Sequence, residues 1–155
     1  MSVPTIYLDA DACPVKEQVY RVAARYQVPL IVVANKPLFI PGQAGLNARL
    51  ELVPDSPDAA DDLIAERATA RDLVLTADIP LAARVIANGA RCLDFRGGEF
   101  NPNRIGDALA ARDLNAHLRS MGIETSGPPP FSQRDRGKFA STLDAAVGRL
   151  ARDSG

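Results

Sequence analysis

Two carboxylates stand where an apolar run near the start of the chain ends abruptly. Residues 6–8 are Ile, Tyr and Leu; Asp9 and Asp11 come next, and Pro14 suits the first turn of a helix. In an open α/β sheet, ligands bind at the carboxyl ends of strands, where a pair of acids is suited to holding a divalent metal ion. The opening residues therefore predict a metal site between a first strand and a first helix.

A second set of acids occurs near the middle of the chain. Asp58, Asp61 and Asp62 are spaced at i, i+3 and i+4, so they share one side of a helix start, where like charges repel one another. A metal ion would relieve that repulsion. Asp78 again stands where a predicted strand gives way to a helix. Acids therefore recur at the points where the predicted sheet binds ligands.

All of these candidate ligands are oxygen donors, without a histidine among them. Such hard ligands favour Mg²⁺ or Mn²⁺ over Zn²⁺. Each acid also has a structural interpretation, because a carboxylate at a helix start caps the helix or interacts favourably with its dipole. That alternative applies most directly to Asp11 and Asp58. The predicted metal ligands are Asp9, Asp61, Asp62 and Asp78, and the predicted catalytic residues are these four together with Asp11.

Basic residues follow the ends of two predicted strands and surround the start of the last predicted helix. Where such residues converge on the acids, they bind the phosphates whose metal the acids hold. The alternative is an ordinary solvated face, and the net charge of −1 gives no overall attraction towards nucleic acid. The candidate phosphate-binding residues are Lys36, Arg96, Arg134, Arg136 and Lys138.

The two cysteines show no metal-type spacing and predict a reduced, cytoplasmic protein. Cys13 stands at a predicted helix start, but the residue six positions later is Val19, so the Cys-x5-Arg loop of cysteine phosphatases is absent. We therefore expect a packed thiol there. The chain has no signal-peptide-like start and no apolar run of about 18 residues, which argues against association with a membrane.

Short β-branched runs separated by segments of helical period predict an α/β fold. The helices that position the acids are expected to begin at Pro14, at Ser56 as an N-cap with Pro57 in the first turn, and at Pro80. A longer helix capped by Asn101 or Asn103 should carry Ile105, Ala108, Leu109 and Leu118. The predicted strands cover residues 5–9, 30–34, 49–53, 73–76 and 91–95.

Strands joined by helices imply parallel pairing with right-handed crossovers. We expect a mostly parallel sheet of about five strands in the order 3-2-1-4-5, in a three-layer α/β/α domain. This order makes strands one and four neighbours, so Asp9 and Asp78 lie side by side. We expect one domain over residues 1–155, with a terminal helix at about 133–152 attached by a proline-rich connector. The sequence leaves open whether the protein forms a homo-oligomer.

Four spaced motifs resemble the bacterial YaiI/YqxD family. They comprise residues 8–16, 58–62, 76–82 and 93–97, and the likeness continues through the Pro-Pro-Pro-Phe connector into the last helix. The resemblance covers nearly the whole chain and implies a fold similar to the PIN nuclease domain, although the family itself is regarded as uncharacterised.

PIN nucleases carry acids after strand one, on an early helix, at the start of the helix before strand four, and just after strand four. Asp9 matches the first position, Asp61 or Asp62 the third, and Asp78 the fourth. The early-helix acid has no clear counterpart, and Asp11 takes its place. The resemblance thus implies a metal-dependent phosphodiesterase acting on RNA, with DNA as the less favoured substrate.

Two other functions stay open. An incomplete acid set is compatible with a PIN-like nucleic-acid-binding or adaptor module that lacks catalysis. The spacing of Asp9 and Asp11 also imitates the nucleophile and general acid of haloacid-dehalogenase-like phosphatases. Against the phosphatase, Cys13 stands where that motif prefers Thr or Val, and no late paired-acid motif is evident.

Overall fold

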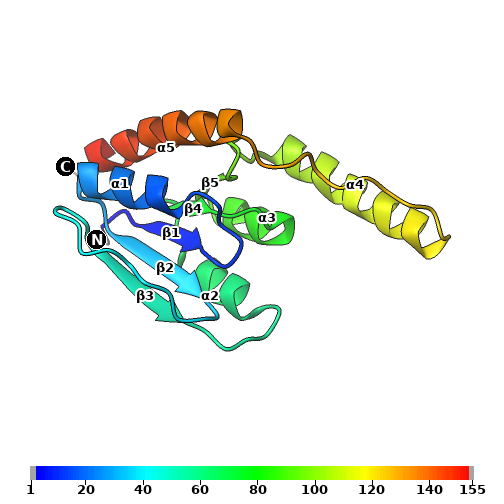
Figure 1. The fold of residues 1–155 in the computed structure, drawn as a ribbon, viewed down its shortest axis with the longest axis horizontal. Coiled ribbons are helices and arrows are strands. Elements are labelled where there is room, and N and C mark those ends of the chain that lie inside the picture. Colours follow the sequence, from blue (N-terminus) through cyan, green and yellow to red (C-terminus); the bar gives the residue numbers. More distant parts are fainter. Residues whose placement is uncertain (1–2, 154–155) are drawn as a thin grey trace.

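Five parallel strands form the centre of the molecule, a computed structural model in which residues 3–153 are described (Figure 1). The strand order is β3-β2-β1-β4-β5, which confirms the predicted order. Leu8 of the first strand pairs with Val32 on one side and with Leu75 on the other. The strands are β1 (Ile6–Asp9), β2 (Leu30–Ala34), β3 (Ala48–Leu52), β4 (Leu73–Leu75) and β5 (Arg91–Leu93).

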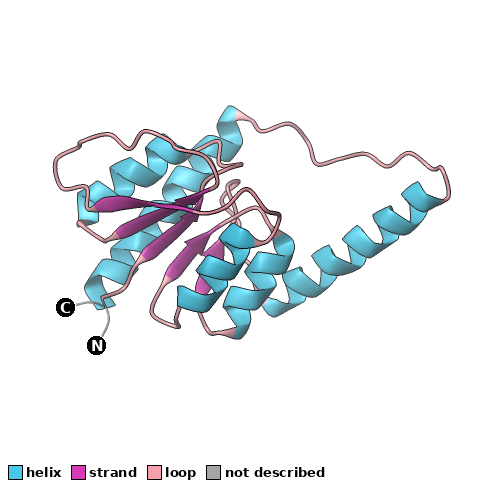
Figure 2. Ribbon diagram, turned by 90° about the horizontal axis from the view of Figure 1, so that it is seen from below, coloured by secondary structure: helices cyan, strands magenta, loops and turns pink. Residues whose placement is uncertain are grey.

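Helices cover both faces of this sheet and give the predicted three layers (Figures 1 and 2). The first and last helices pack together on one face, and two shorter helices cover the other. Among residues 3–153, no helix is long and apolar enough to cross a membrane. The helices are α1 (Lys16–Tyr26), α2 (Ala59–Arg67), α3 (Ile79–Ala87), α4 (Pro102–Ser120) and α5 (Gln133–Asp153).

Burial along the strands follows from their place in the sheet. All five residues of β2 are buried, as expected for a continuous apolar run covered on both faces. In β3, at the edge, Leu52 is exposed and Glu51 is half-buried. The apolar side chains of α1 and α5 complete the larger core. In this core the Phe95 and Phe139 rings pack edge to face, with their centroids 6.2 Å apart.

Two predicted helix starts are wrong, and both errors lie at the edge where the strands end. The first helix begins at Lys16, not Pro14, because the chain first turns with the Cys13 amide bonded to the Ala10 carbonyl at 3.1 Å. The second begins at Ala59, so Ser56 is not its N-cap. Residues 54–57 instead form a separate turn before the helix.

The long helix α4 departs from the rest of the molecule (Figure 2). It carries a side-chain cap from Asn101, whose Oδ1 accepts a bond from the Arg104 amide at 2.8 Å, as predicted for one of the two candidate caps. From the far end of α4 the chain returns as an extended segment containing Pro128–Pro130 and enters α5. The predicted last helix is confirmed within one residue.

Candidate functional site

A cavity of about 430 Å³ opens where β1, β2 and β4 end. No Lys or Arg is among the described residues that line it, whereas five carboxylates and one carboxamide are. The carboxyl ends of parallel strands are the expected ligand position of such a sheet. The lining residues are Asp9, Asp11, Asn35, Val53, Asp55, Ser56, Pro57, Ala60, Asp61 and Asp78.

Asp9 is the last residue of β1, and a buried hydroxyl fixes its orientation. Thr76 is fully buried, and its Oγ1 donates to Asp9 Oδ2 at 2.7 Å. The Thr76 Oγ1 also accepts a bond from the Asp78 amide at 3.0 Å. The hydroxyl proton is therefore committed to Asp9, and a single threonine connects the ends of two neighbouring strands.

Asp78 both caps a helix and lines the cavity. Its Oδ1 accepts a bond from the Leu81 amide at 2.9 Å, as an N-cap of α3 does. The capping interpretation and the functional interpretation of this residue are thus compatible. The backbone β-region conformation at Asp78 turns the chain from β4 into α3 and brings its carboxylate beside the end of β1.

The structure separates the two acids that could occupy the third predicted position. Asp61 lies in the first turn of α2 and lines the cavity. Asp62, the next residue, is exposed and forms an ion pair with Arg84 of α3, with Nη1 and Oδ1 2.8 Å apart. Of the two, Asp61 is therefore the one brought to Asp9 and Asp78.

Asp11 lies on the other side of the cavity, where the backbone after β2 holds it. Its two carboxylate oxygens both accept from the Asn35 amide, at 3.2 and 3.0 Å. The Asn35 side chain then donates to Asp55 Oδ1 at 3.0 Å. Three lining residues, which follow β1, β2 and β3, are linked in this way.

Burial and mutual repulsion raise the pKa values of two of these acids. The pKa of Asp61 is raised to about 6 by burial and by the negative charges of Asp78, Asp9 and Asp58. Burial also raises the pKa of Asp9, against the lowering effect of the Thr76 hydrogen bond, and the charges of Asp78 and Asp11 raise it further. Three elements thus converge on one region of negative potential.

The donor set suits a hard divalent cation in type and charge, but the carboxylates are not drawn together. Among residues 3–153, no three acid, His or Cys side chains are close enough to form a ready-made metal-binding group. Mg²⁺ commonly takes only one or two protein carboxylates and keeps several waters. Asp9, Asp61 and Asp78 therefore fit such an ion as partial ligands around a wide cavity.

Two of the predicted phosphate-binding residues are engaged elsewhere. The Arg96 Nη1 lies 3.0 Å from Asp135 Oδ2, and its guanidinium also binds the connector carbonyls. Arg136 lies over the Phe131 ring at 5.5 Å and contacts the Pro14 carbonyl at 3.4 Å. These contacts give both arginines a structural role next to the connector.

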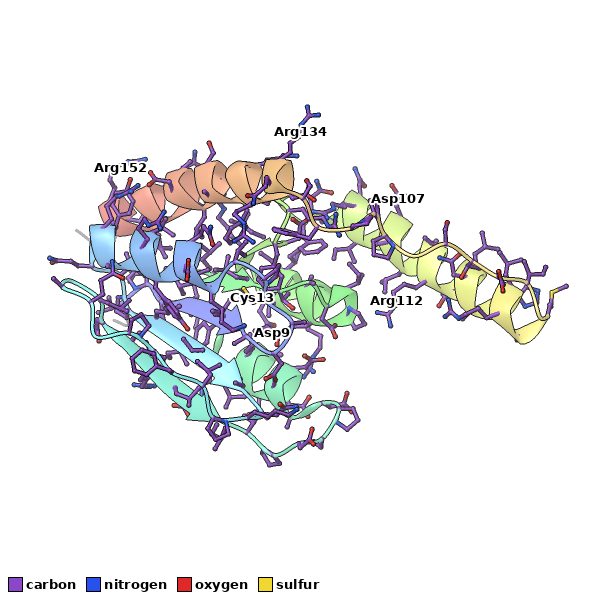
Figure 3. All side chains as sticks on the ribbon, viewed as in Figure 1. Asp9, Cys13, Asp107, Arg112, Arg134 and Arg152 are labelled. Atoms are coloured by element: carbon purple, nitrogen blue, oxygen red, sulfur yellow. The ribbon has the colours of Figure 1, made fainter. Side chains whose placement is uncertain are left out.

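The other three predicted phosphate-binding residues are exposed. Lys36 adjoins Asn35, which lines the cavity. Arg134 points outward from the start of α5 (Figure 3). Lys138 packs against Gly97, in the turn after β5. Of the five candidates, Lys36 is the one placed by its neighbour at the acidic cavity.

Cys13 is buried and makes no part of the acidic cavity. Burial raises its pKa to about 11, although the Val15 amide bonds to its sulfur at 3.4 Å. The thiol is therefore protonated at neutral pH, as expected for a packed cysteine. It borders a second hollow with Lys16, Glu17 and Arg136.

Thr76, Asn35 and Asp55 were not predicted as site residues. Thr76 stands at the end of a predicted strand next to Asp78, which was the signal that could have found it. Asn35 and Asp55 follow the second and third strands, so the topological argument applied to the acids extends to them.

Comparison with known proteins places the chain in a family. A family model described as "Uncharacterized BCR, YaiI/YqxD family" matches residues 7–149. The chain belongs to this family. The resemblance seen in its motifs is thereby confirmed, and no solved structure matches the chain.

Relatives in the YaiI/YqxD family match this chain along nearly their full length. A UPF0178 protein from Trichlorobacter lovleyi is 50% identical over 152 residues, which cover 97% of each chain. One from Geobacter sulfurreducens is 49% identical over 150 residues, or 95% of this chain and 98% of the relative. One from Rhodopseudomonas palustris is 47% identical over 154 residues, or 99% and 98%.

Proposed function

We propose that this protein is a metal-dependent phosphodiesterase that acts on RNA and uses Mg²⁺ or Mn²⁺. The observation that carries the proposal is the meeting of Asp9, Asp61 and Asp78 at one cavity, from β1, α2 and the start of α3. Burial, together with the negative charges of Asp78 and Asp9, raises the pKa of Asp61 to about 6, and a divalent cation would offset the repulsion among these charges.

Asp9, Asp61 and Asp78 would hold the ion, with Asp11 available to a second ion or a bound water. When bound, the ion supplies a water of lowered pKa for attack on phosphorus and offsets charge on the leaving oxygen. Thr76 keeps Asp9 in one orientation through its 2.7 Å bond. Lys36, beside the cavity, is the candidate for contact with the substrate phosphate.

The family resemblance supports this proposal through the similarity to PIN nucleases. In that comparison Asp9 and Asp78 take the positions after strands one and four, and Asp61 takes the position at the start of the intervening helix. The placement of these three residues around one cavity is what a shared site requires. RNA is the substrate that this likeness favours.

The proposal is tested by incubating a pool of single-stranded and structured RNA with the protein and Mn²⁺. We expect cleavage that depends on Mn²⁺ and falls by at least about a hundredfold in the double variant Asp9→Asn with Asp78→Asn, because both partial ligands are lost. Asp62→Asn is the matched control, since Asp62 lies outside the cavity lining and pairs with Arg84. Activity that survives in the double variant refutes the site.

An RNA-binding adaptor is the second candidate, and the position of Glu17 favours it. Glu17 is the acid in the first turn of α1, yet it borders the hollow beside Cys13 and not the acidic cavity. The early-helix acid of PIN nucleases thus has no equivalent among the described lining residues. Binding of RNA without turnover, with and without Mn²⁺, would support the adaptor.

A haloacid-dehalogenase-like phosphatase can be distinguished from the proposed nuclease because it uses an aspartate as a covalent nucleophile. Beryllium fluoride forms a stable adduct with an aspartate nucleophile of that type, and here the nucleophile would be Asp9. A nuclease of the proposed kind forms none. An adduct on Asp9, detected by mass or by fluorine resonance, would assign the phosphatase.

A further inference from the structure

The outer part of α4 extends into solvent away from the sheet and the other helices (Figures 1 and 2). Residues 106–123 are called the arm here, and residues 124–132 the connector. Within α4, all of which is described, Ile105 is the one buried residue, and it lies at the root of the arm. The helical part of the arm is about four turns long, and beyond Leu109, which packs against the core near the root, it has no core of its own.

The turn at residues 94–98 holds both ends of this projection. Asp94 forms an ion pair with Arg104 at the start of α4, and the Arg104 guanidinium stacks on the Phe100 ring at 4.2 Å. Arg96, in the same turn, binds the carbonyl oxygens of residues 129 and 130 at the end of the connector. The arm is thus anchored at its base and is not a loose segment.

An apolar stripe runs along the arm. Among residues 3–153, six large hydrophobic side chains are exposed, and three of them are Leu114 at 57%, Met121 at 61% and Ile123 at 46%. Ala111, Leu114, Leu118 and Met121 follow one another at intervals of three, four and three residues, which is the seam of a coiled coil. An exposed helix of this length is marginal in water unless its apolar face is packed.

We propose that the arm is a dimerisation element, in which α4 pairs antiparallel with α4 of a second copy of the chain. The seam is symmetric about residue 116, as an antiparallel pair requires. Reversing the helix places Leu114 against Leu118 of the partner subunit and Ala111 against Met121 of the partner subunit. The central layers then pack leucine against leucine, and the outer layers pack the small Ala111 against the longer Met121 of the partner subunit.

Charge on the arm favours a second copy over nucleic acid. The arm carries two arginines, Arg112 and Arg119, and two aspartates, Asp107 and Asp113. This balance gives neither repulsion between copies nor attraction for phosphates. Asp107, four residues before Ala111, occupies the next seam position towards the sheet, so the apolar part of the seam ends there. Arg112 projects on another side of the helix (Figure 3).

The oligomeric state of the full chain tests the proposal. Sedimentation or light scattering should give twice the chain mass of 16.5 kDa. Leu114→Glu places two charges in the central layers and should weaken association by more than about tenfold. Phe39→Glu is the matched control, because Phe39 is 84% exposed outside the arm, and it should leave the dimer intact.

Helix content by circular dichroism should be unchanged in both variants. A wild-type chain that stays monomeric at high micromolar concentration overturns the proposal. So does a dimer that Leu114→Glu leaves unchanged, since the copies would then meet elsewhere.

The orientation of the pair is tested by spin labels at Ser120→Cys and Gly106→Cys. At 1.5 Å rise per residue, antiparallel pairing about residue 116 separates the two labelled sites along the axis by about 12 Å at residue 120 and about 30 Å at residue 106. The native cysteines do not compete for label, because burial raises the pKa of Cys13 to about 11 and of Cys92 to about 12. Equal short distances at both sites would show a parallel pair and contradict the model of the dimer.

Discussion

One hydroxyl group connects the aspartates that end β1 and follow β4. Thr76 donates to Asp9 and accepts from the Asp78 amide, and the whole side chain is excluded from water. An acid at the end of a buried strand has few protein partners available, because the neighbouring strands are apolar. The threonine therefore satisfies Asp9 without neutralising it, and leaves its negative charge directed at the cavity.

Thr76→Val is expected to destabilise the protein by about 1–3 kcal/mol, because the half-buried Asp9 carboxylate and the Asp78 amide each lose a hydrogen-bond partner. Thr76→Ser keeps the hydroxyl and removes one methyl group, so its loss should be about 1 kcal/mol or less. Urea unfolding measures both. Equal losses in the two variants would mean that packing, and not the hydrogen bonds, gives Thr76 its importance.

The raised pKa of Asp61 predicts a specific pH dependence of stability. Its pKa of about 6 in the folded protein lies above the ordinary value of 3.8. The contribution of Asp61 to folding stability is therefore fully present below about pH 4 and is lost as pH rises through about 6, where the carboxylate becomes charged in the folded protein. Asp61→Asn should therefore stabilise the protein more at pH 7 than at pH 4, by about 1 kcal/mol or less because solvent screens a partly exposed side chain.

Asp62→Asn provides the control for this measurement. Asp62 is the neighbouring residue on the same helix, but it faces Arg84 and not the other acids. The variant should show no gain in stability between pH 4 and pH 7. A gain of the same size in both variants would place the cause in the charge of the helix start and not in the cavity.

The turn between β5 and α4 is the element that joins the sheet, the arm and the last helix. Asp94 Oδ1 accepts from the Arg96 and Gly98 amides, at 2.7 and 2.9 Å. Gly97 between them has φ +91°, and a Cβ there would lie 2.8 Å from the Lys138 carbonyl carbon. The close approach of α5 to the sheet edge thus depends on a glycine at this position.

Gly97→Ala is expected to destabilise the protein by more than about 1 kcal/mol, because it strains the backbone and collides with the main chain of α5. Gly106→Ala is the matched glycine on α4, where a Cβ meets nothing within 4 Å. There the substitution should stabilise by about 0.5–1 kcal/mol through helix propensity. Thermal unfolding that shifts in the same direction for both would contradict this account.

The order of the strands could be predicted from the sequence because it depends on a few strong constraints. The apolar run of β2 required cover on both faces, and helical segments between strands required parallel crossovers. The meeting of Asp9 and Asp78 followed from that order. The choice between Asp61 and Asp62 did not, because it depends on where α2 begins, and the turn at residues 54–57 delays that start.

The arm was not predictable from the pattern of its helix. Ile105, Leu109 and Leu118 have the spacing of a helix with an apolar side, but among residues of α4 Ile105 alone is buried. Periodicity states that a face is apolar and does not state whether the chain itself or another molecule covers it. Sequence patterns were equally insufficient for the arginines that bind elsewhere than the cavity, because the connector carbonyl that accepts a bond from Arg96 is far from Arg96 in sequence.

The topology of the sheet brings together charged residues that are far apart in the chain. Asp9, Asp61 and Asp78 come from β1, α2 and the junction of β4 with α3; the pairing of β1 with β4 places Asp9 near Asp78, and the packing of α2 beside β1 adds Asp61. Folding therefore creates the repulsion, and a ligand that removes it binds the folded state in preference to the unfolded chain. Such a ligand stabilises the protein by mass action.

Mn²⁺ is accordingly expected to raise the melting temperature in the absence of RNA. At a hundred times its dissociation constant, a ligand specific for the folded state adds about 2.7 kcal/mol, which for a chain of this length corresponds to about 5–10 °C. Asp62→Asn should keep the shift, whereas the double variant Asp9→Asn with Asp78→Asn should lose most of it. Because the measurement requires no turnover, a shift in the wild type without RNA cleavage would locate the ion and favour the adaptor over the nuclease. An equal shift in the double variant would place Mn²⁺ binding outside the acidic cavity.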